Sequence, residues 1–535
     1  MRLFLSTLLL ALGARAAQAG TPQPPAISGA ALLEQITALA SDELEGRAPG
    51  THGETLTIDY LQQQFKKLGL EPGNPDGTYL QAVPLVGVSS HPALSYSKDG
   101  KATTLKFGED YVSWTAQALP TVDVSNSELV FVGYGVQAPP FQWDDYKGAD
   151  LKGKTLLMLI NDPPVPDPKH PHQLDPRVFG GSAMTWYGHW QYKFAMAAQT
   201  GAAAALIVHE TQPAGYPWDV VVSSWDRENF ALKSKKPAPD LPSVPGWLRG
   251  ERARDLFKAA GLDFDALKQQ AATRAFKPMP LGIKLNVTTL NAVRELTSHN
   301  VVGKISGSDP QLKNEVVIYS AHWDHFGIDE TLPGPRTQQI FHGALDNASG
   351  VAALLQIARA YKALPAAPKR TILFVLTTAE ERGMLGAQYY ARHPLYPLDK
   401  TLLDINVDGL NMWGRARTVA LSGMGRSTAD ELVTAAAAKQ GRKVSSAEPG
   451  SYYRGDQIEF AKAGVPTIYL RSSGNRDKQL RYMTQQFHTV NDTVQPGWDT
   501  SGAVEDIALL FQAGYAAAQG KDAPKWKDGA EFKRR

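Results

Sequence analysis

Apolar strands and amphipathic helices alternate along the second half of the chain. From about residue 299, short runs of consecutive apolar residues are each followed by a segment with apolar residues at helical spacing. This alternation predicts a three-layer α/β/α sandwich around a mixed, mostly parallel sheet. The predicted strands span residues 299–307, 315–322, 370–378, 400–411 and 465–470, and the predicted helices span residues 347–364, 380–393, 427–441 and 500–518.

The first half of the chain has a different pattern. Residues 28–72 contain two segments with helical spacing, separated by a loop rich in Gly and Pro. Between residues 120 and 290, short apolar runs alternate with Pro-rich loops, which is typical of a small β-rich domain. The pattern divides the chain into an N-terminal part of the α/β domain at 20–118, an inserted β-rich domain at 119–290, the main α/β domain at 291–520 and a basic tail at 521–535. We expect that tail to be a frayed end.

The first 19 residues have the three parts of a secretory signal peptide. Arg2 precedes an apolar run over residues 3–12, and Ala17-Gln18-Ala19 supplies a cleavage site. The apolar run is too short to span a bilayer, and no Cys lies at the cleavage site to carry a lipid anchor. We therefore expect an exported protein, periplasmic or secreted, without a stable membrane anchor.

Charge and cysteine content narrow the possible chemistry. The 535 residues include 55 basic and 53 acidic residues, which gives a net charge of +2, and removal of the signal peptide would leave the mature chain neutral. A neutral chain argues against a nucleic-acid partner. Cys is absent, so any metal must be bound by His, Asp and Glu rather than by thiolates. The oligomeric state is left open by the sequence.

Acidic residues and histidines recur where the predicted strands end. Open α/β sheets bind ligands at the carboxyl ends of their strands, which meet at one edge. Each residue alone has an ordinary structural explanation, such as a helix cap or an Asx-turn. Together they would form a concentration of charge that requires cations when it is removed from water. The residues are His322, Asp324, Asp346, Glu380, Glu381, Asp408 and His488.

The types of ligand indicate two metal ions. Imidazole and carboxylate groups without thiolates favour Zn²⁺, with Mn²⁺ or Co²⁺ as alternatives. Five such ligands are too many for one tetrahedral catalytic ion, and they suit two ions about 3.5–4 Å apart that share a bridging carboxylate. One residue of the pair Glu380 and Glu381 would then remain free to act as a general base on the bridging water.

Five short motifs, taken in order, resemble the M28 family of di-zinc aminopeptidases. The resemblance covers roughly residues 25–115 and 290–520, and the opening segment LASDELEGRAPGT is also similar to these enzymes. The intervening segment resembles a protease-associated (PA) domain, inserted as in several secreted members. The motifs are AHWDHFG, GALDNASG, TTAEERGMLGA, NVDG and FHTVNDT.

The resemblance implies a role for each of the strand-end residues. Glu380 would take a proton from the bridging water and pass it to the leaving amine. Asp324 would accept a hydrogen bond from the far ring nitrogen of His322 and so fix the tautomer of that ligand. The implied metal ligands are His322 and Asp408 for one zinc, Glu381 and His488 for the other, and Asp346 as the bridge between them.

The sequence departs from the family at two positions near the expected site. Some relatives have Tyr before the last His, where it can stabilise the oxyanion, whereas this chain has Phe487. The stretch that often reads Ser-Asp-His in relatives is Gly455-Asp456-Gln457 here. Neither departure falls on an expected metal ligand, so both bear on specificity. The nearby Tyr453 and Arg454 are candidate substrate-binding residues, and Tyr452 or Tyr453 could supply the missing hydroxyl.

The leading functional hypothesis is an exported metallo-aminopeptidase that acts on peptides. Three alternatives stay open from the sequence. The chain could be a carboxypeptidase or dipeptidase of the same fold, a glutaminyl-cyclase-like acyltransferase, or a binding protein that has lost catalysis. The last alternative would be expected to have broken ligand positions, and none is broken here.

Overall fold

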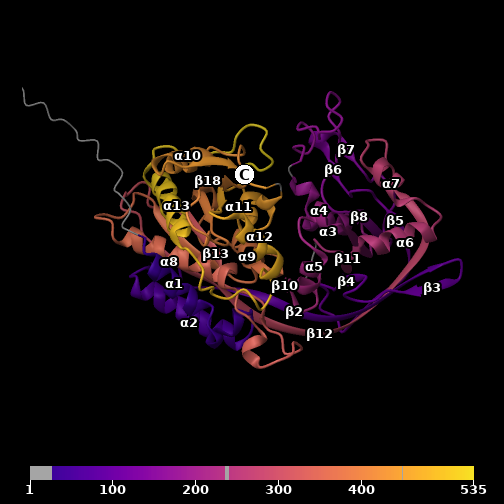
Figure 1. Cartoon of the computed structure of the whole chain (residues 1–535), viewed down its shortest axis with the longest axis horizontal. Helices are drawn as coiled ribbons and strands as arrows, with labels where there is room; N and C mark the ends of the chain where they lie inside the picture. Colours follow the sequence, from indigo (N-terminus) through magenta and orange to yellow (C-terminus); the bar gives the residue numbers. More distant parts are fainter. Residues whose placement is uncertain (1–26, 183, 235–239, 449, 535) are drawn as a thin grey trace, which may run out of the picture.

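The computed structural model describes residues 27–182, 184–234, 240–448 and 450–534. The predicted signal peptide at 1–19 lies outside these residues. Figure 1 shows two lobes joined along one side by a long ribbon of strands. None of the described helices is both long enough and apolar enough to cross a membrane.

The first lobe is built on a mixed sheet with parallel central strands. The strand order is β19-β18-β20-β17-β13-β16-β12. β13 pairs in parallel with β16 and β17, and β17 pairs in parallel with β20, whereas β12 and β18 pair antiparallel with their neighbours β16 and β20. This arrangement confirms the predicted sheet. Its strands, apart from β12, are β13 (Val316–His322), β16 (Thr371–Thr377), β17 (Thr401–Asn406), β18 (Thr418–Leu421), β19 (Lys443–Ser446) and β20 (Thr467–Ser472).

Side chains alternate across the central strands and bury both faces of this sheet. Val317 and Tyr319 lie in the large core that includes α8 and α13, while Val316 and Ile318 pack with Tyr390 of α9 on the opposite face. Successive residues of a strand point to opposite faces, so both faces must be covered by helices, as predicted. The helices of this lobe are α1 (Gly29–Leu39), α2 (His52–Lys67), α8 (Ser349–Lys362), α9 (Leu385–Arg392), α10 (Ala429–Lys439), α11 (Gln457–Lys462), α12 (Arg476–Gln485) and α13 (Ser501–Gln519).

The predicted helix over 380–393 is interrupted near its start. Residues Glu380–Arg382 form a separate helical turn, and α9 begins only at Leu385. Gly383 and Met384 have φ angles of 104° and 61°, a left-handed backbone that cannot continue a right-handed helix. The interruption leaves Glu380 and Glu381 on a short turn directly after β16.

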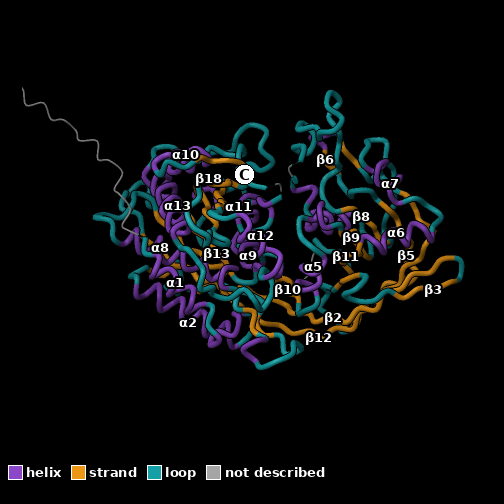
Figure 2. Tube along the Cα trace, in the orientation of Figure 1, coloured by secondary structure: helices purple, strands orange, loops and turns teal. Residues whose placement is uncertain are grey.

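The inserted segment forms a second lobe that contains helices as well as the expected strands. Its sheet has the order β5-β8-β9-β11-β4, with parallel pairing from β5 through β11 (Figure 2). β4 precedes residue 119, so this lobe begins earlier in the chain than predicted. Its elements are β4 (Tyr111–Ser113), β5 (Thr121–Phe131), β6 (Gln137–Ala138), β7 (Trp143–Asp144), β8 (Thr155–Leu159), α3 (Trp190–Gln199), β9 (Ala204–His209), α4 (Thr211–Ala214), α5 (Trp218–Trp225), β10 (Asn229–Leu232), β11 (Val244–Arg249), α6 (Gly250–Ala259) and α7 (Phe264–Ala271).

Two long strands connect the lobes. β2 (Leu80–Lys98) and β12 (Met279–Ile305) pair antiparallel along most of their length. The C-terminal end of β12 pairs with β16 and its N-terminal part pairs with β5, so this one strand belongs to the sheets of both lobes. It is much longer than the predicted strand at 299–307. The remaining short strands are β1 (Glu71–Pro72), β3 (Lys101–Thr104), β14 (Gly327–Ile328) and β15 (Ile340–Phe341).

The C-terminal segment is docked on the first lobe. Trp526 donates a hydrogen bond from Nε1 to the main-chain oxygen of Gly464 at 2.9 Å, and Phe532 is buried. Arg534 donates to two main-chain oxygens of the same lobe, each at 2.9 Å. The expectation of a frayed end is therefore wrong, because Trp526, Phe532 and Arg534 attach this segment to the lobe.

Candidate metal centre

Three parallel strands and two loops bring the predicted ligands to one edge of the sheet. β13 ends at His322, β16 leads into the turn with Glu381, and β17 is followed by Asp408. Asp346 lies in the turn that precedes α8, and His488 lies in the loop after α12. We refer to these five residues as the ligand cluster. Their convergence confirms the expectation that distant parts of the chain meet at the carboxyl ends of the strands.

One half of the ligand cluster is arranged around His322. Its Nε2 lies 3.2 Å from Asp346 Oδ1 and 3.7 Å from Asp408 Oδ1. Its Nδ1 donates to the main-chain oxygen of Asp324 at 3.1 Å. Because a carbonyl oxygen can only accept, this contact places a proton on Nδ1, and Nε2 is the nitrogen that faces the two carboxylates.

The other half is arranged around His488. Its Nε2 lies 3.2 Å from Asp346 Oδ2 and 3.2 Å from Glu381 Oε2. The second carboxylate oxygen, Glu381 Oε1, lies 2.6 Å from Nδ1 of His325. Asp346 thus presents one oxygen to each half of the cluster, which is the position expected of a bridging carboxylate.

The distances between the nitrogen and oxygen atoms of the ligand cluster fit a bound divalent metal ion. Zinc binds nitrogen and oxygen ligands at about 2.0–2.2 Å, so two ligands of a tetrahedral site lie roughly 3.3 Å apart. The separations between each histidine Nε2 and its carboxylate oxygens are 3.2–3.7 Å. Two groups of possible metal donors share Asp346, the first with His322 and Asp408 and the second with Glu381 and His325. His325 is therefore an additional candidate ligand, or a residue that orients Glu381.

Glu380 lies beside the ligand cluster, on the same turn as Glu381. Burial raises the pKa of Glu380 well above its usual range, and the charge of Asp408 acts in the same direction. The main-chain N–H of Glu380 donates to Asp324 Oδ1 at 3.0 Å. Asp324 Oδ1 is 3.7 Å from His322 Nδ1, which is too far for a hydrogen bond. The carboxylate of Asp324 therefore holds the turn of Glu380, and the main-chain oxygen of Asp324 accepts the hydrogen bond from His322.

Asp492 supports the turn that carries Asp346. Its carboxylate is fully buried and accepts from the main-chain N–H groups of Leu345 and Asp346, each at 3.0 Å, and from Tyr482 Oη at 3.1 Å. Sequence reasoning missed this residue, although it lies inside the quoted motif FHTVNDT. The motif thus contains both a candidate ligand, His488, and the carboxylate that holds the turn of Asp346.

Replacement of Asp492 by Ala is expected to weaken both the fold and the metal site. It leaves buried N–H donors without an acceptor, which costs roughly 1–3 kcal/mol for each donor. We expect a lower urea midpoint and a lower zinc content after dialysis. Asp492→Asn keeps one acceptor oxygen and should have a smaller effect on both quantities. Equal midpoints and zinc contents for Asp492→Ala and the native chain would contradict this role.

Arg47 ties the N-terminal segment to the cluster. This side chain is 1% exposed, and its guanidinium donates to four main-chain oxygens, which belong to Leu39, Trp323, His342 and Gly343. Trp323 follows His322 directly, and Gly343 begins the loop that leads to Asp346. The motif with Arg47, DELEGRAPGT, therefore holds two ligand-bearing segments together rather than supplying a ligand.

A cavity of about 2040 Å³ lies between the lobes and reaches the ligand cluster. Several hydrogen bonds cross between the lobes beside it. Arg382 donates from Nη1 to the main-chain oxygen of Ser224 at 3.1 Å, and Gln191 donates to the main-chain oxygen of Gly383 at 3.5 Å. The inserted lobe contributes many aromatic side chains to the walls, among them Trp186, Trp190, Tyr216, Trp225 and Phe230.

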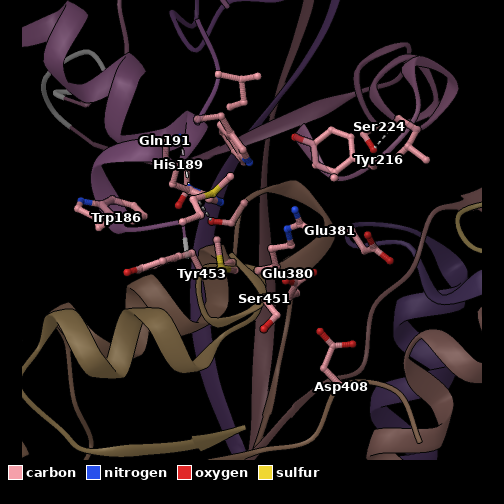
Figure 3. Close-up of a pocket in the computed structure, with 18 of the residues that line it drawn as sticks. Trp186, His189, Gln191, Tyr216, Ser224, Glu380, Glu381, Asp408, Ser451 and Tyr453 are labelled. Atoms are coloured by element: carbon pink, nitrogen blue, oxygen red, sulfur yellow. Dashed lines mark hydrogen bonds between the residues drawn. The ribbon is translucent and has the colours of Figure 1, made fainter. Parts of the chain in front are cut away.

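The candidate substrate-binding residues line this cavity, but their polar groups are already engaged. The Tyr453 hydroxyl donates to Glu531 at 2.6 Å, so this residue lines the cavity with its aromatic ring (Figure 3). Arg454 donates to the main-chain oxygen of Ala214 in the inserted lobe at 2.8 Å. The hydroxyl of Tyr452 is paired with Thr467 at 2.8 Å. Neither tyrosine hydroxyl is directed at the ligand cluster.

The fold and the site define an α/β protein with a cluster of histidines and carboxylates, a candidate metal centre, at the carboxyl ends of parallel strands. Residues 300–512 match the model of peptidase family M28. The matched residues include all five members of the ligand cluster.

Two curated relatives are similar to part of the chain. Aminopeptidase NAALADL1 of Mus musculus is 31% identical over 186 residues, which cover 32% of this chain and 22% of that protein. Aminopeptidase YwaD of Bacillus subtilis is 25% identical over 212 residues, which cover 38% of this chain and 42% of that protein. The chain thus spans less than half the length of both relatives.

A solved structure extends the likeness to the whole fold. The aminopeptidase from Aneurinibacillus sp. strain AM-1 superimposes with a TM-score of 0.54 at 18% identity, over 95% of this chain and 98% of that chain. At this identity the likeness concerns the fold, and it includes both lobes.

Proposed function

We propose that this chain is an exported metallo-aminopeptidase that removes N-terminal residues from peptides with the aid of two zinc ions. The observation that carries the proposal is the position of Asp346. Its two oxygens lie 3.2 Å from Nε2 of His322 and 3.2 Å from Nε2 of His488. A single carboxylate between two histidines suits a pair of ions that share one bridge. The family match and the relatives named aminopeptidase support the same reaction class.

Each residue of the site has a defined task in this proposal. His322 and Asp408 would hold one ion, His488 and Glu381 the other, with Asp346 between them. Two bound zinc ions would supply a water with a pKa lowered to about 7 and would polarise the scissile carbonyl.

Glu380 is the proton carrier of the proposed reaction. Its carboxylate accepts the proton of the attacking water and delivers it to the leaving amine. The hydrogen bond from its main-chain N–H to Asp324 fixes the turn on which it lies. Its side chain lines the cavity beside the ligand cluster.

The inserted lobe would limit access to the site. We propose that it is a PA-like domain, whose aromatic side chains line the cavity opposite the ligand cluster. Hydrogen bonds of Arg382 and Gly383, the two residues after Glu381, cross between the lobes. In this proposal a folded protein could not reach the site unless the lobes separate. Short peptides are therefore the proposed substrates.

A set of end-blocked peptides tests the reaction class. The zinc-loaded chain is incubated with one hexapeptide in three forms, which are free, N-acetylated and C-amidated, and the products are identified by mass spectrometry. We expect sequential loss from the N-terminus of the free and amidated forms and no cleavage of the acetylated form. Loss from the C-terminus would instead identify a carboxypeptidase, and conversion of an N-terminal Gln to pyroglutamate would identify a cyclase. Absence of any product would favour a binding protein.

A further inference from the structure

Glu531 of the docked C-terminal segment lies where the two lobes meet. Its Oε2 accepts from the Tyr453 hydroxyl and from Arg426 Nη1, each at 2.6 Å. Its Oε1 accepts from the main-chain N–H of Trp186 in the inserted lobe at 3.1 Å. One carboxylate therefore connects the tail, the first lobe and the inserted lobe.

The side chains of Glu531, Arg426 and Tyr453 are all hydrogen-bonded to one another in the first lobe. Arg426 donates from Nη2 to the Tyr453 hydroxyl at 2.7 Å and from Nη1 to Glu531. The side chains of Arg426 and Glu531 are 22% and 19% exposed, so the ion pair is partly shielded from water and stronger than a surface pair. These mutual hydrogen bonds hold the Glu531 carboxylate in one orientation, with its other oxygen, Oε1, directed at the main-chain N–H of Trp186.

Trp186 begins the part of the inserted lobe that forms a wall of the cavity. It starts a short helical turn that leads directly into α3, whose first turn is capped by His189. The Trp186 ring stacks on His189 at 5.3 Å and lies 6.1 Å from the ring of Tyr453. All three residues line the cavity that reaches Glu380 and Asp408 (Figure 3).

We propose that Glu531 is a positioning residue that fixes this wall of the cavity relative to the metal centre, and thereby sets how peptides are held there. The tail would then be a clasp between the lobes, anchored on the first lobe by Trp526 and Arg534 and linked to the inserted lobe through Glu531. The consequence for substrate binding rests on the proposed peptidase function. The clasp itself does not.

Glu531→Ala in the full-length, zinc-loaded chain tests the clasp. Loss of the acceptor should speed amide exchange of the segment 184–190, measured by mass spectrometry. Loss of about one net hydrogen bond to the wall should raise KM for a tripeptide about five- to tenfold, while kcat stays within about twofold, because the ligand cluster is untouched. Glu531→Gln retains an acceptor oxygen and should shift both quantities less.

Lys527→Ala is the matched control in the same segment. Lys527 Nζ pairs with Asp430 of the first lobe at 3.4 Å, and none of its described contacts reaches the inserted lobe. Unchanged exchange and KM in Lys527→Ala, together with both changes in Glu531→Ala, would support the proposal. Exchange and KM of Glu531→Ala equal to those of the native chain would overturn it, as would a loss of kcat alone. Exchange is measured without substrate, so failure of the clasp is distinguishable from failure of the peptidase assignment.

Discussion

Glu380→Gln should abolish peptide hydrolysis while both metal ions stay bound. The side chain keeps its size, but an amide cannot accept and return a proton, and general acid–base catalysis contributes about 10²–10⁴-fold to rate. We therefore expect kcat on an amino-acid p-nitroanilide to fall by at least about 10³-fold, with unchanged zinc content. The ligands proposed for the two ions do not include Glu380, which is why metal should remain.

Glu448→Gln is a suitable control for the loss of a carboxylate from the cavity. Glu448 also lines the cavity but is highly exposed, where it pairs with Arg476. Its replacement should leave kcat within about twofold, because surface ion pairs contribute little. If Glu380→Gln turned over substrate at a rate similar to that of this control, Glu380 would not be the base.

Asp346→Ala should remove metal from both halves of the site. His322 and His488 each lie 3.2 Å from a different oxygen of this side chain, so its loss takes one ligand from each ion. We expect zinc content after dialysis to fall well below that of Glu380→Gln. Activity should fall at least about 10³-fold, because metal ions supply several kcal/mol of charge stabilisation in such reactions.

A comparison of these two variants separates catalysis from metal binding. The account requires an inactive variant that keeps its zinc, Glu380→Gln, and an inactive variant that loses it, Asp346→Ala. If Asp346→Ala still bound two zinc ions per chain, this carboxylate would not be a bridge. Each ion would then be held by its other ligands without Asp346.

The ligand cluster could be predicted from the sequence because sheet topology fixes where strand ends lie. His322, Glu381 and Asp408 follow three apolar strands, and parallel pairing forces the ends of such strands to one edge. Asp346 and His488 lie in loops, where no strand end fixes their position, so the resemblance to known motifs gave them their specific roles. The predicted α/β/α layers follow from the same apolar strands, which require helices on both faces.

Other features depend on contacts between distant residues, which local pattern does not reveal. Asp492 is one of several acidic residues in polar loops, and only the fold shows that it accepts from the turn of Asp346. The basic residues of the tail suggested exposure. The hydrogen bond of Trp526 to Gly464 and the burial of Phe532 instead dock it on the lobe. The hydroxyl of Tyr453, proposed to face substrate, is directed instead at Glu531.

Metal stoichiometry tests the central claim most directly. The purified chain is stripped with a chelator, reloaded with excess zinc, passed through a desalting column and measured by elemental analysis against protein concentration. The shared carboxylate of Asp346 predicts two zinc ions per chain, with activity restored in parallel. One ion or none per chain, under conditions in which the chain remains folded, would contradict the account.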